Sequence, residues 1–372
     1  MENKMNINFF GKDRYYNENS ENILKIVNEV YSHGKVVMGP EVSGFEKKIA
    51  KYCDRKYAVA VGSCTDALYF SLLGAKINPG DEVLVTGFSF IASASCILMA
   101  KATPVFVDIN PDTYMMDVSD LENKITSKTK AIIAVNLFGD ALNFETVEDV
   151  ATRYSLPIIE DAAQSIGSRY GSRKVGTLGL GSCISFDPTK LLSAQSNGGV
   201  ILTDNPEFYS YVSKIRYHGK DLNTGEFDTL GFNSRLSSLQ AAFLSYNLDR
   251  LDSWIERNQQ IARRYVEGIS INPDIKLPKE RKESRHVFHK FVMQLEGRGK
   301  LSEWLKSNGI QNMVHYEKAL SENKLFLPYK HRAEQLNNID SVKTKVLSLP
   351  IHPWLNDDEV DYIIDKVLAF KG

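Results

Sequence analysis

The sequence contains few cysteines and no long apolar runs, and these two absences exclude several classes of protein. Only four cysteines occur among 372 residues, with no CxxC pair and no histidine at zinc spacing, so we expect neither a disulfide framework nor a metal site. The longest apolar stretches, residues 91–100 and 131–135, are far shorter than the about 20 residues of a membrane span. The first ten residues lack the apolar region of a signal peptide. We therefore expect a cytoplasmic protein with reduced thiols.

The chain also lacks an excess of either charge. Lys and Arg number 45 and Asp and Glu number 46, which leaves a formal net charge of -1. Such a balance provides no field for holding polyanions, so we expect no nucleic-acid partner and no membrane partner. The apolar and charged fractions, 43% and 24%, are those of an ordinary globular protein, and the length predicts two or three domains.

Between residues 57 and 204, short β-branched runs alternate with helical patterns. Five nearly continuous apolar runs indicate strands covered on both faces: residues 57–62, 82–86, 104–109, 131–137 and 156–160. The intervening segments begin with residues that commonly start helices and predict helices over residues 65–73, 89–99 and 143–154. This alternation predicts an α/β domain with a mostly parallel central sheet and helices on both faces.

The second half of the chain predicts a smaller domain. Two more strands are expected at residues 182–186 and 199–203, and apolar residues at helical spacing then predict one long helix over 236–265. Residues 272–285 are rich in Lys and Glu and indicate a surface linker. A strand and two helices follow, at residues 289–295, 300–308 and 357–369. We predict a large domain over residues 1–248, including an N-terminal arm, and a small α+β domain over 249–372.

Two of the predicted strands lead into turns with polar side chains, at the sheet edge where open α/β sheets bind ligands. Ser63, Cys64 and Thr65 lie at the start of a helix, which is the position of an anion site or of an ordinary capped turn. Asp161 follows a buried strand, where an unpaired carboxylate is costly. It either meets a cationic group or caps a helix.

Two further positions complete a pattern. Lys190 lies between a strand and a Gly-Gly turn; it is either a surface lysine or a partly desolvated amine that can act as a nucleophile. Phe90 begins a helix after the second strand and is either a core residue or a surface on which a ring can stack. A lysine, a carboxylate, an aromatic ring and a phosphate site at one sheet edge are what pyridoxal phosphate requires.

Seven segments give the chain a more specific resemblance. They are GKVVMGPEVSGFE, GSCTDALYFSLLGAKINPGDEVLV, FSFIASAS, TPVFVDINPDTY, IIEDAAQSIGS, ISFDPTKLLSAQSNGGVILTD and GFNSRLSSLQAA. In this order, from about residue 35 to 352, they resemble the DegT/DnrJ/EryC/StrS family of nucleotide-sugar aminotransferases. The resemblance implies a pyridoxal-phosphate-dependent enzyme of fold type I, in which pyridoxamine phosphate is an intermediate.

The resemblance also implies a role for each matching residue. Lys190 matches the lysine that forms the Schiff base, and Asp161 matches the partner of the pyridine nitrogen. The other cofactor-binding positions are Ser63, Cys64, Thr65, Phe90, Gln164 and Ser185. In the family a residue of the neighbouring subunit completes the phosphate site, and we assign it to Asn233, with Arg235 second. The active sites would then be shared across a homodimer. The predicted substrate-binding residues are Gly39, Pro40, Glu41, Arg235, His315 and Tyr316.

The resemblance also indicates the reaction. L-Glutamate would donate the amino group, leaving 2-oxoglutarate, and a nucleotide-diphosphate keto sugar would receive it. We expect the substrate to be a dTDP-4-keto-6-deoxyhexose; the choice of C4 rests on the SCT form of residues 63–65, which resembles that of the family's C4 enzymes. A 3-keto isomer and a UDP sugar are the alternatives. Sugar dehydratases of the family carry histidine in place of Lys190, which argues against that chemistry here. Asn136 stands where a histidine is frequent, and we expect it near the ring or the substrate.

Three rival functions remain to be weighed. A different pyridoxal-phosphate enzyme, such as a cysteine desulfurase or a decarboxylase, would share the cofactor residues. A desulfurase needs a cysteine on a mobile loop, however, and the cysteines of this chain are expected in strands, in helices or in the turn of residues 63–65. A non-catalytic regulatory homologue would be favoured by loss of Lys190 or Asp161, and both residues are present. A nicotinamide-binding fold lacks its glycine-rich fingerprint after a strand.

Overall fold

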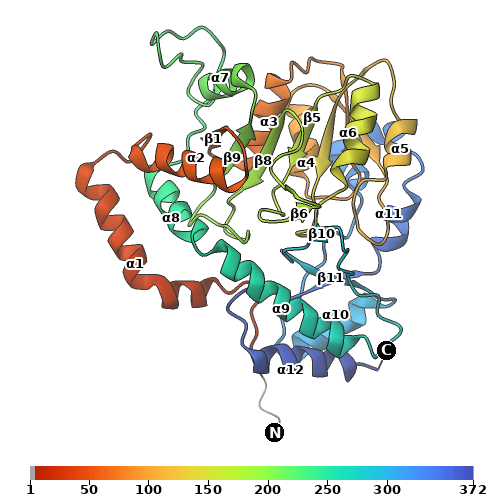
Figure 1. Ribbon diagram of the computed structural model, residues 1–372. Coiled ribbons are helices and arrows are strands. Elements are labelled where there is room, and N and C mark those ends of the chain that lie inside the picture. The colour runs from red at the N-terminus through yellow and green to blue at the C-terminus, as the bar shows by residue number, and fades with distance from the viewer. Residues whose placement is uncertain (1–4, 372) are drawn as a thin grey trace.

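The computed structural model describes residues 5–371 and is built around a seven-stranded sheet (Figure 1). The strands lie in the order β1 (Tyr57–Val61), β9 (Gly199–Thr203), β8 (Gly181–Ser185), β5 (Ile158–Asp161), β4 (Thr129–Val135), β2 (Glu82–Thr86) and β3 (Thr103–Val107). Only β9 runs antiparallel to its neighbours in this sheet. Every residue of β2, β5, β8 and β9 is buried, as expected for strands covered on both faces. The predicted α/β fold with a mostly parallel sheet is confirmed.

Helices connect and cover these strands. Those of the large α/β part are α1 (Lys12–His33), α2 (Pro40–Tyr52), α3 (Cys64–Gly74), α4 (Ala92–Met99), α5 (Val118–Asn123), α6 (Phe144–Arg153) and α7 (Pro206–Ile215). Later helices are α8 (Ser238–Leu248), α9 (Leu251–Ile269), α10 (Arg298–Ser307), α11 (Asn337–Val342) and α12 (Asp357–Leu368). The short strands are β6 (Arg169–Tyr170), β7 (Arg173–Lys174), β10 (Ser284–Arg285), β11 (Phe291–Gln294) and β12 (Val346–Leu349). Two 3-10 segments, Leu320–Glu322 and Lys324–Arg332, lie between α10 and α11.

The prediction of one long helix over residues 236–265 is wrong, because α8 and α9 are separate helices. At the break, Arg250 has φ −109° and ψ −8°, which depart from regular helical values. Its guanidinium donates to Tyr246 O at 2.8 Å and lies over the Tyr246 ring at 3.5 Å, which holds the turn together. Since no proline or glycine marks the break, the apolar spacing alone could not reveal it.

Residues 272–285, predicted to be a surface linker, are attached to the large part of the molecule. The Arg281 guanidinium donates to the buried Asp140 carboxylate at 2.7 Å. β10 then pairs antiparallel with β6. A buried carboxylate requires such a partner, but the Lys- and Glu-rich composition of the segment predicts only its exposure and not this attachment.

The buried side chains form two clusters. The larger surrounds the seven-stranded sheet, and the smaller lies among α9, α10, α12 and the two-stranded sheet of β11 and β12. The N-terminal segment, which the sequence places with the large domain, contributes Ile7 to the smaller cluster, where its amide donates to Gly309 O at 2.8 Å. In Figure 1, α9 leads from the sheet toward α12. The division at residues 248 and 249 stays a prediction.

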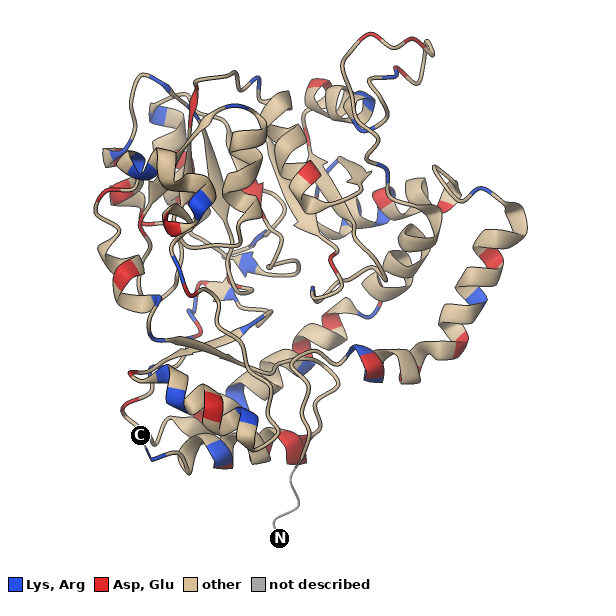
Figure 2. Cartoon of the chain, turned by 180° about the vertical axis from the view of Figure 1, so that it is seen from behind, with Lys and Arg blue, Asp and Glu red and all other residues tan. Residues whose placement is uncertain are grey.

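The surface carries both signs of charge. Figure 2 shows Lys and Arg interspersed with Asp and Glu over the helices of both parts, in keeping with the net charge of -1. Among residues 5–371, no helix has the length and apolarity needed to cross a membrane. The four cysteines are buried and unpaired.

We expect buried histidines to make the stability of this fold sensitive to acid. The His286 ring is buried, which lowers its pKa from 6.5 to about 4, and its Nδ1 accepts the Phe288 N–H at 2.8 Å. The unfolded chain therefore binds more protons than the native chain in this window, so the free energy of unfolding falls as the pH falls from 6.5 to about 4. We expect His286 to contribute roughly 3 kcal/mol to this loss, measured by urea unfolding at several pH values.

His286→Asn is the informative variant because its side-chain oxygen can accept the same N–H without titrating. We expect the free energy of unfolding of this variant to fall less steeply toward acid pH than that of the wild type. His331→Asn, at an exposed position, should leave this pH dependence unchanged. If His286→Asn and the wild type lose stability equally toward acid pH, His286 is not responsible for this effect.

Candidate active site

A cavity of about 500 Å³ lies at the carboxyl ends of the central strands. Its wall includes Val135, Asp161 and Ser185, the last residues of β4, β5 and β8, and the opposite wall is formed by residues near β11 and β12. Ten of the predicted site residues line it: Ser63, Cys64, Thr65, Phe90, Asp161, Gln164, Ser185, Lys190, His315 and Tyr316. Residues distant in the sequence therefore form one site of a size typical for small ligands.

Lys190 is held by a turn that follows β8. Its amide donates to Asp187 O at 2.9 Å, and the Asp187 carboxylate accepts the amide of Thr189 at 2.8 Å. The side chain lines the cavity, where burial lowers the pKa of the amine and the charges of Asp161 and Asp187 partly oppose this. A lowered pKa makes the neutral, nucleophilic amine available.

Asp161 presents its carboxylate to the same cavity from the end of β5. Oδ2 accepts a hydrogen bond from Ser93 Oγ at 2.6 Å, and Oδ1 accepts the amide of Ala163 at 3.1 Å. Burial raises the pKa of this carboxyl, while the hydrogen bonds and the charge of Lys190 oppose the rise. The carboxylate is fixed in position and has no ion-pair partner among the described residues, so a cationic group in the cavity would stabilise it.

The turn between β1 and α3 has the features of an anion site. Ser63 is the N-cap of α3, and its hydroxyl accepts the amide of Asp66 at 3.1 Å. The amides of the next residues lie at the positive end of the helix. Gly199 packs so closely on this turn that a Cβ there would lie 2.6 Å from Cys64 N. Ser185 lies on the same cavity wall. This arrangement of hydroxyls, amides and close backbone suits a phosphate group.

Gln164 links the two walls of the cavity. Its Oε1 accepts the Phe138 amide at 3.0 Å, and its Nε2 donates to the Tyr316 hydroxyl at 3.0 Å. Burial raises the pKa of Tyr316, so its hydroxyl stays protonated. His315 lies beside it, with Nδ1 2.8 Å from Ser348 Oγ. Burial lowers the pKa of His315 to about 3 and leaves its ring neutral.

The two aromatic residues before α4 have different environments. Phe88 is fully buried in the core, whereas Phe90 is 56% exposed and lines the cavity. An exposed aromatic ring at a cavity wall is available to stack on a flat ligand. The local sequence FSF could not distinguish them, because both positions follow the same strand.

Five predicted residues do not line this cavity. Gly39, Pro40 and Glu41 begin α2, where the Glu41 carboxylate lies 2.9 Å from His33 Nε2. Asn233 is exposed, and its Oδ1 accepts from Arg235 at 2.8 Å. Between Asn233 and Arg235, the Ser234 hydroxyl points inward and donates to Asp66 Oδ2 at 2.7 Å. The roles of these residues stay predictions.

The expectation that Asn136 lies near the ring or the substrate is wrong. Its side chain is fully buried, donates to Glu160 Oε1 at 2.7 Å and accepts the Leu142 amide at 2.8 Å. This is a structural role behind the cavity wall. Fifteen residues that line the cavity were not predicted, and among them are Phe10, Ser93, His289 and Lys290. The signal for the last two was a His-Lys pair directly before an apolar strand.

The residues present fit pyridoxal phosphate. The Lys190 amine, the Asp161 carboxylate and the exposed face of Phe90 line one cavity together with the hydroxyl-rich turn of residues 63–65. An amine, an anion for the pyridine nitrogen, an aromatic surface and a phosphate site are the groups that this cofactor requires. Within residues 5–371, no cluster of His, Cys, Asp and Glu could hold a metal ion.

Comparison with known proteins gives the same assignment. The model of the DegT/DnrJ/EryC1/StrS aminotransferase family matches residues 17–368. A pleiotropic regulatory protein of Geobacillus stearothermophilus is 35% identical over 98% of this chain and 99% of its own. The dTDP-3-amino-3,6-dideoxy-alpha-D-galactopyranose transaminase of Aneurinibacillus thermoaerophilus is 36% identical over 93% of this chain and 94% of its own.

A third relative and a solved structure extend this comparison. The UDP-2-acetamido-2-deoxy-3-oxo-D-glucuronate aminotransferase of Pseudomonas aeruginosa is 33% identical over 91% of this chain and 92% of its own. The crystal structure of NtdA from Bacillus subtilis with bound PMP, the pyridoxamine form of the cofactor, has a TM-score of 0.91 and 30% identity, over 99% of this chain and 86% of its own. The chain therefore belongs to the DegT/DnrJ/EryC1/StrS aminotransferase family and is a sugar aminotransferase of fold type I that depends on pyridoxal phosphate.

Proposed function

We propose that the protein transfers the amino group of L-glutamate to a dTDP-4-keto-6-deoxyhexose in the cytoplasm. The product would serve the amino sugars of a surface polysaccharide, such as the O-antigen of lipopolysaccharide, or of a similar glycoconjugate. The observation that carries the proposal is the juxtaposition of a desolvated Lys190 amine and a buried Asp161 carboxylate in one cavity. A relative that acts on a dTDP sugar supports the choice of nucleotide.

The roles of the chain's own residues follow from their environments. Bound pyridoxal phosphate supplies an electron sink beside the reacting amino nitrogen. The Asp161 carboxylate would stabilise a positive charge on the ring nitrogen of the cofactor. Hydrogen bonds from Ser93 Oγ and the Ala163 amide fix the orientation of this carboxylate. Burial lowers the pKa of the Lys190 amine and so favours its neutral form. This amine would accept a proton from the carbon that bears the amino group and would return one to the adjoining carbon of the cofactor. Gln164 and Tyr316 together hold the walls of the cavity in place.

Product identification tests the substrate. We expect purified protein supplied with glutamate to aminate a dTDP-4-keto-6-deoxyhexose in preference to its 3-keto isomer and to UDP-keto sugars, with the products identified by mass spectrometry and NMR. Faster amination of a UDP sugar would contradict the dTDP assignment and leave the aminotransferase chemistry intact.

A second candidate is amination at C3. Both transaminases named above carry a 3-amino or 3-oxo designation, which favours this position, and the 3-keto isomer in the same panel decides between the two. The name of the Geobacillus relative favours a regulatory role. Such a protein would fail to aminate every sugar of the panel, despite the presence of Lys190 and Asp161.

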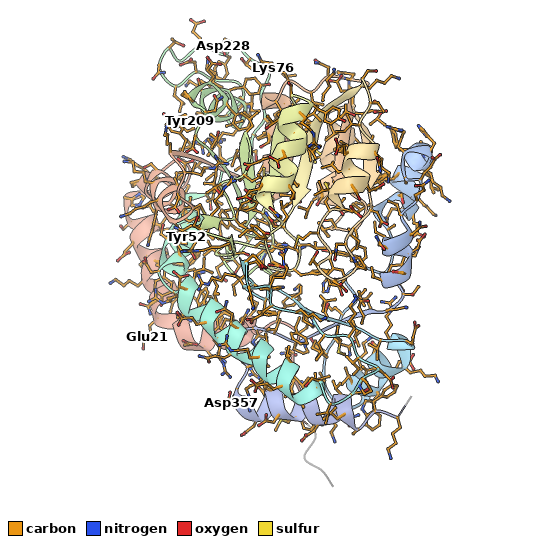
Figure 3. The ribbon with its side chains drawn as sticks, turned by 45° about the vertical axis from the view of Figure 1, so that its right-hand side comes forward. Glu21, Tyr52, Lys76, Tyr209, Asp228 and Asp357 are labelled. Carbon is orange, nitrogen blue, oxygen red and sulfur yellow. The ribbon has the colours of Figure 1, made fainter. Side chains whose placement is uncertain are left out.

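We also propose a homodimer with shared active sites. The loop of residues 220–231 projects away from the sheet, as Figure 1 and the labelled Asp228 in Figure 3 show. It carries exposed apolar side chains, with Leu230 87% and Phe227 66% exposed, and such surface is usually covered by a partner. Asn233 and Arg235 follow this loop and do not line the cavity of their own chain, so a second copy of the chain can receive them.

Subunit complementation tests the shared site. We expect Asn233→Ala to weaken cofactor retention on the order of ten- to a hundredfold, because one charge-assisted hydrogen bond to the neighbour's phosphate is lost. Mixing the inactive Lys190→Ala protein with Asn233→Ala should then restore activity, up to half that of a wild-type dimer. In a mixed dimer, one site would carry both defects and the other neither. No recovery from subunits that demonstrably exchange would place Asn233 within its own chain's function.

A further inference from the structure

The same cavity contains a second lysine that the proposed reaction does not use. Lys290 immediately precedes β11, is only 6% exposed and lines the cavity from the side of the smaller cluster. Its backbone amide donates to Phe138 O at 3.1 Å, which fixes the start of the side chain. The ammonium lies 4.9 Å and 4.5 Å from the ring centroids of Phe9 and Phe10. Among residues 5–371, no carboxylate forms an ion pair with its Nζ, and no side chain or carbonyl accepts a hydrogen bond from it.

Most of the titratable groups around Lys290 are bases rather than acids. The titratable groups that interact with it or with its neighbour His289 are Lys12, Lys190, Asp187 and His315. Burial, together with the charge of Lys190, lowers the pKa of Lys290 to about 7, and Asp187 only partly opposes this. An amine with only aromatic partners in a buried wall is costly. An anion entering the cavity would offset this cost, since a charge-assisted hydrogen bond is among the stronger contacts of a protein interior.

We propose that Lys290 binds a carboxylate of the substrate and thereby determines which acids the site accepts. The inference rests on the proposed function. Under that function the carboxylate belongs to the amino donor, because a 6-deoxy sugar carries none. The donor's α-carboxylate is bonded to the carbon that reacts above Lys190, and Lys290 lies close enough to Lys190 to respond to its charge. A uronate sugar, such as the one named for the Pseudomonas relative, is the second source of the same chemistry.

The test uses the holoenzyme and measures two half-reactions separately by rapid mixing. In Lys290→Met, we expect the glutamate concentration for half-saturation to rise on the order of ten- to a hundredfold, with a smaller change in the limiting rate. Lys290→Arg should restore tight binding. Lys12→Met is the matched control, because Lys12 is a half-buried lysine whose pKa is also lowered, to about 8. Its Nζ donates to Ser193 Oγ, and the residue does not line the main cavity.

Two further readouts separate this role from a structural one. Binding of 2-oxoglutarate, followed by the change in cofactor absorption, should weaken in the wild type as the pH rises above about 7, since Lys290 loses its proton there. In Lys290→Arg, this binding should be independent of pH over the same range. Cofactor content should be equal in all variants, and a loss of cofactor from Lys290→Met would overturn the proposal by placing Lys290 in the cofactor site.

The two half-reactions also distinguish the two possible sources of the carboxylate. A defect confined to the glutamate half-reaction assigns it to the donor, whereas a defect confined to amination of a UDP-keto-uronate assigns it to the sugar. Equal half-saturation in the wild type and Lys290→Met, for every acid tested, overturns the proposal. Failure of the proposed function has a different signature, because the wild type itself would then show no reaction with glutamate or with the panel's 6-deoxy sugars.

Discussion

Lys190→Ala should abolish turnover while the protein still folds. Under the proposed roles of Lys190, the variant would lose both the amine that holds the cofactor covalently and the base that moves the proton, so we expect the rate to fall by at least about a thousandfold. The amine is desolvated and makes no ion pair among the described residues, so its removal should change the free energy of unfolding by only about 1 kcal/mol. Steady-state amination and urea unfolding measure the two effects.

Borohydride labelling checks the same assignment independently. Reduction of the yellow holoenzyme should fix the cofactor to a single peptide, and we expect that peptide to contain Lys190. Lys130→Ala, at an exposed position on β4, is the control and should leave labelling and rate unchanged. Recovery of the label on a peptide carrying any other lysine would refute the assignment.

Asp161→Asn should have the second-largest effect. The substitution keeps the shape of the side chain and an oxygen that can accept from Ser93, but it removes the negative charge. Under the proposed role of Asp161, the ring nitrogen would no longer be held protonated, so the half-reaction with glutamate should slow on the order of 10²- to 10³-fold. The stability should change little, because the loss of a buried carboxylate with a raised pKa removes a desolvation cost.

The neighbouring residue provides a matched control. Glu160 is also a buried carboxylate of β5, but it does not line the cavity and accepts from Ser182 Oγ and the amides of Gly176 and Leu178. Glu160→Gln should therefore lower the stability, since its amide group meets these donors, and should leave the half-reaction nearly unchanged. If Asp161→Asn reacts at a rate close to that of the wild type, another acid holds the ring nitrogen.

Much of the fold and of the site could be predicted from local patterns. The five apolar runs correspond to β1 to β5 because buried parallel strands require continuous apolar residues. Ser63 and Asp161 could be recognised because the carboxyl ends of neighbouring strands necessarily meet at one edge. The family and its cofactor could be predicted from the order of seven sequence motifs, one of which contains Lys190.

Other features depend on contacts between distant residues, which no local pattern records. The break at Arg250 depends on its contacts with Tyr246, and the buried position of Asn136 depends on Glu160. Phe88 and Phe90 have the same side chain and neighbouring positions, yet one is core and the other faces the cavity. Lys290 shows the same limit, because a lysine before a strand is ordinary until the tertiary structure buries it in the cavity without an acidic partner. Burial and partners, which set the pKa and reactivity of such groups, arise only when the chain is folded.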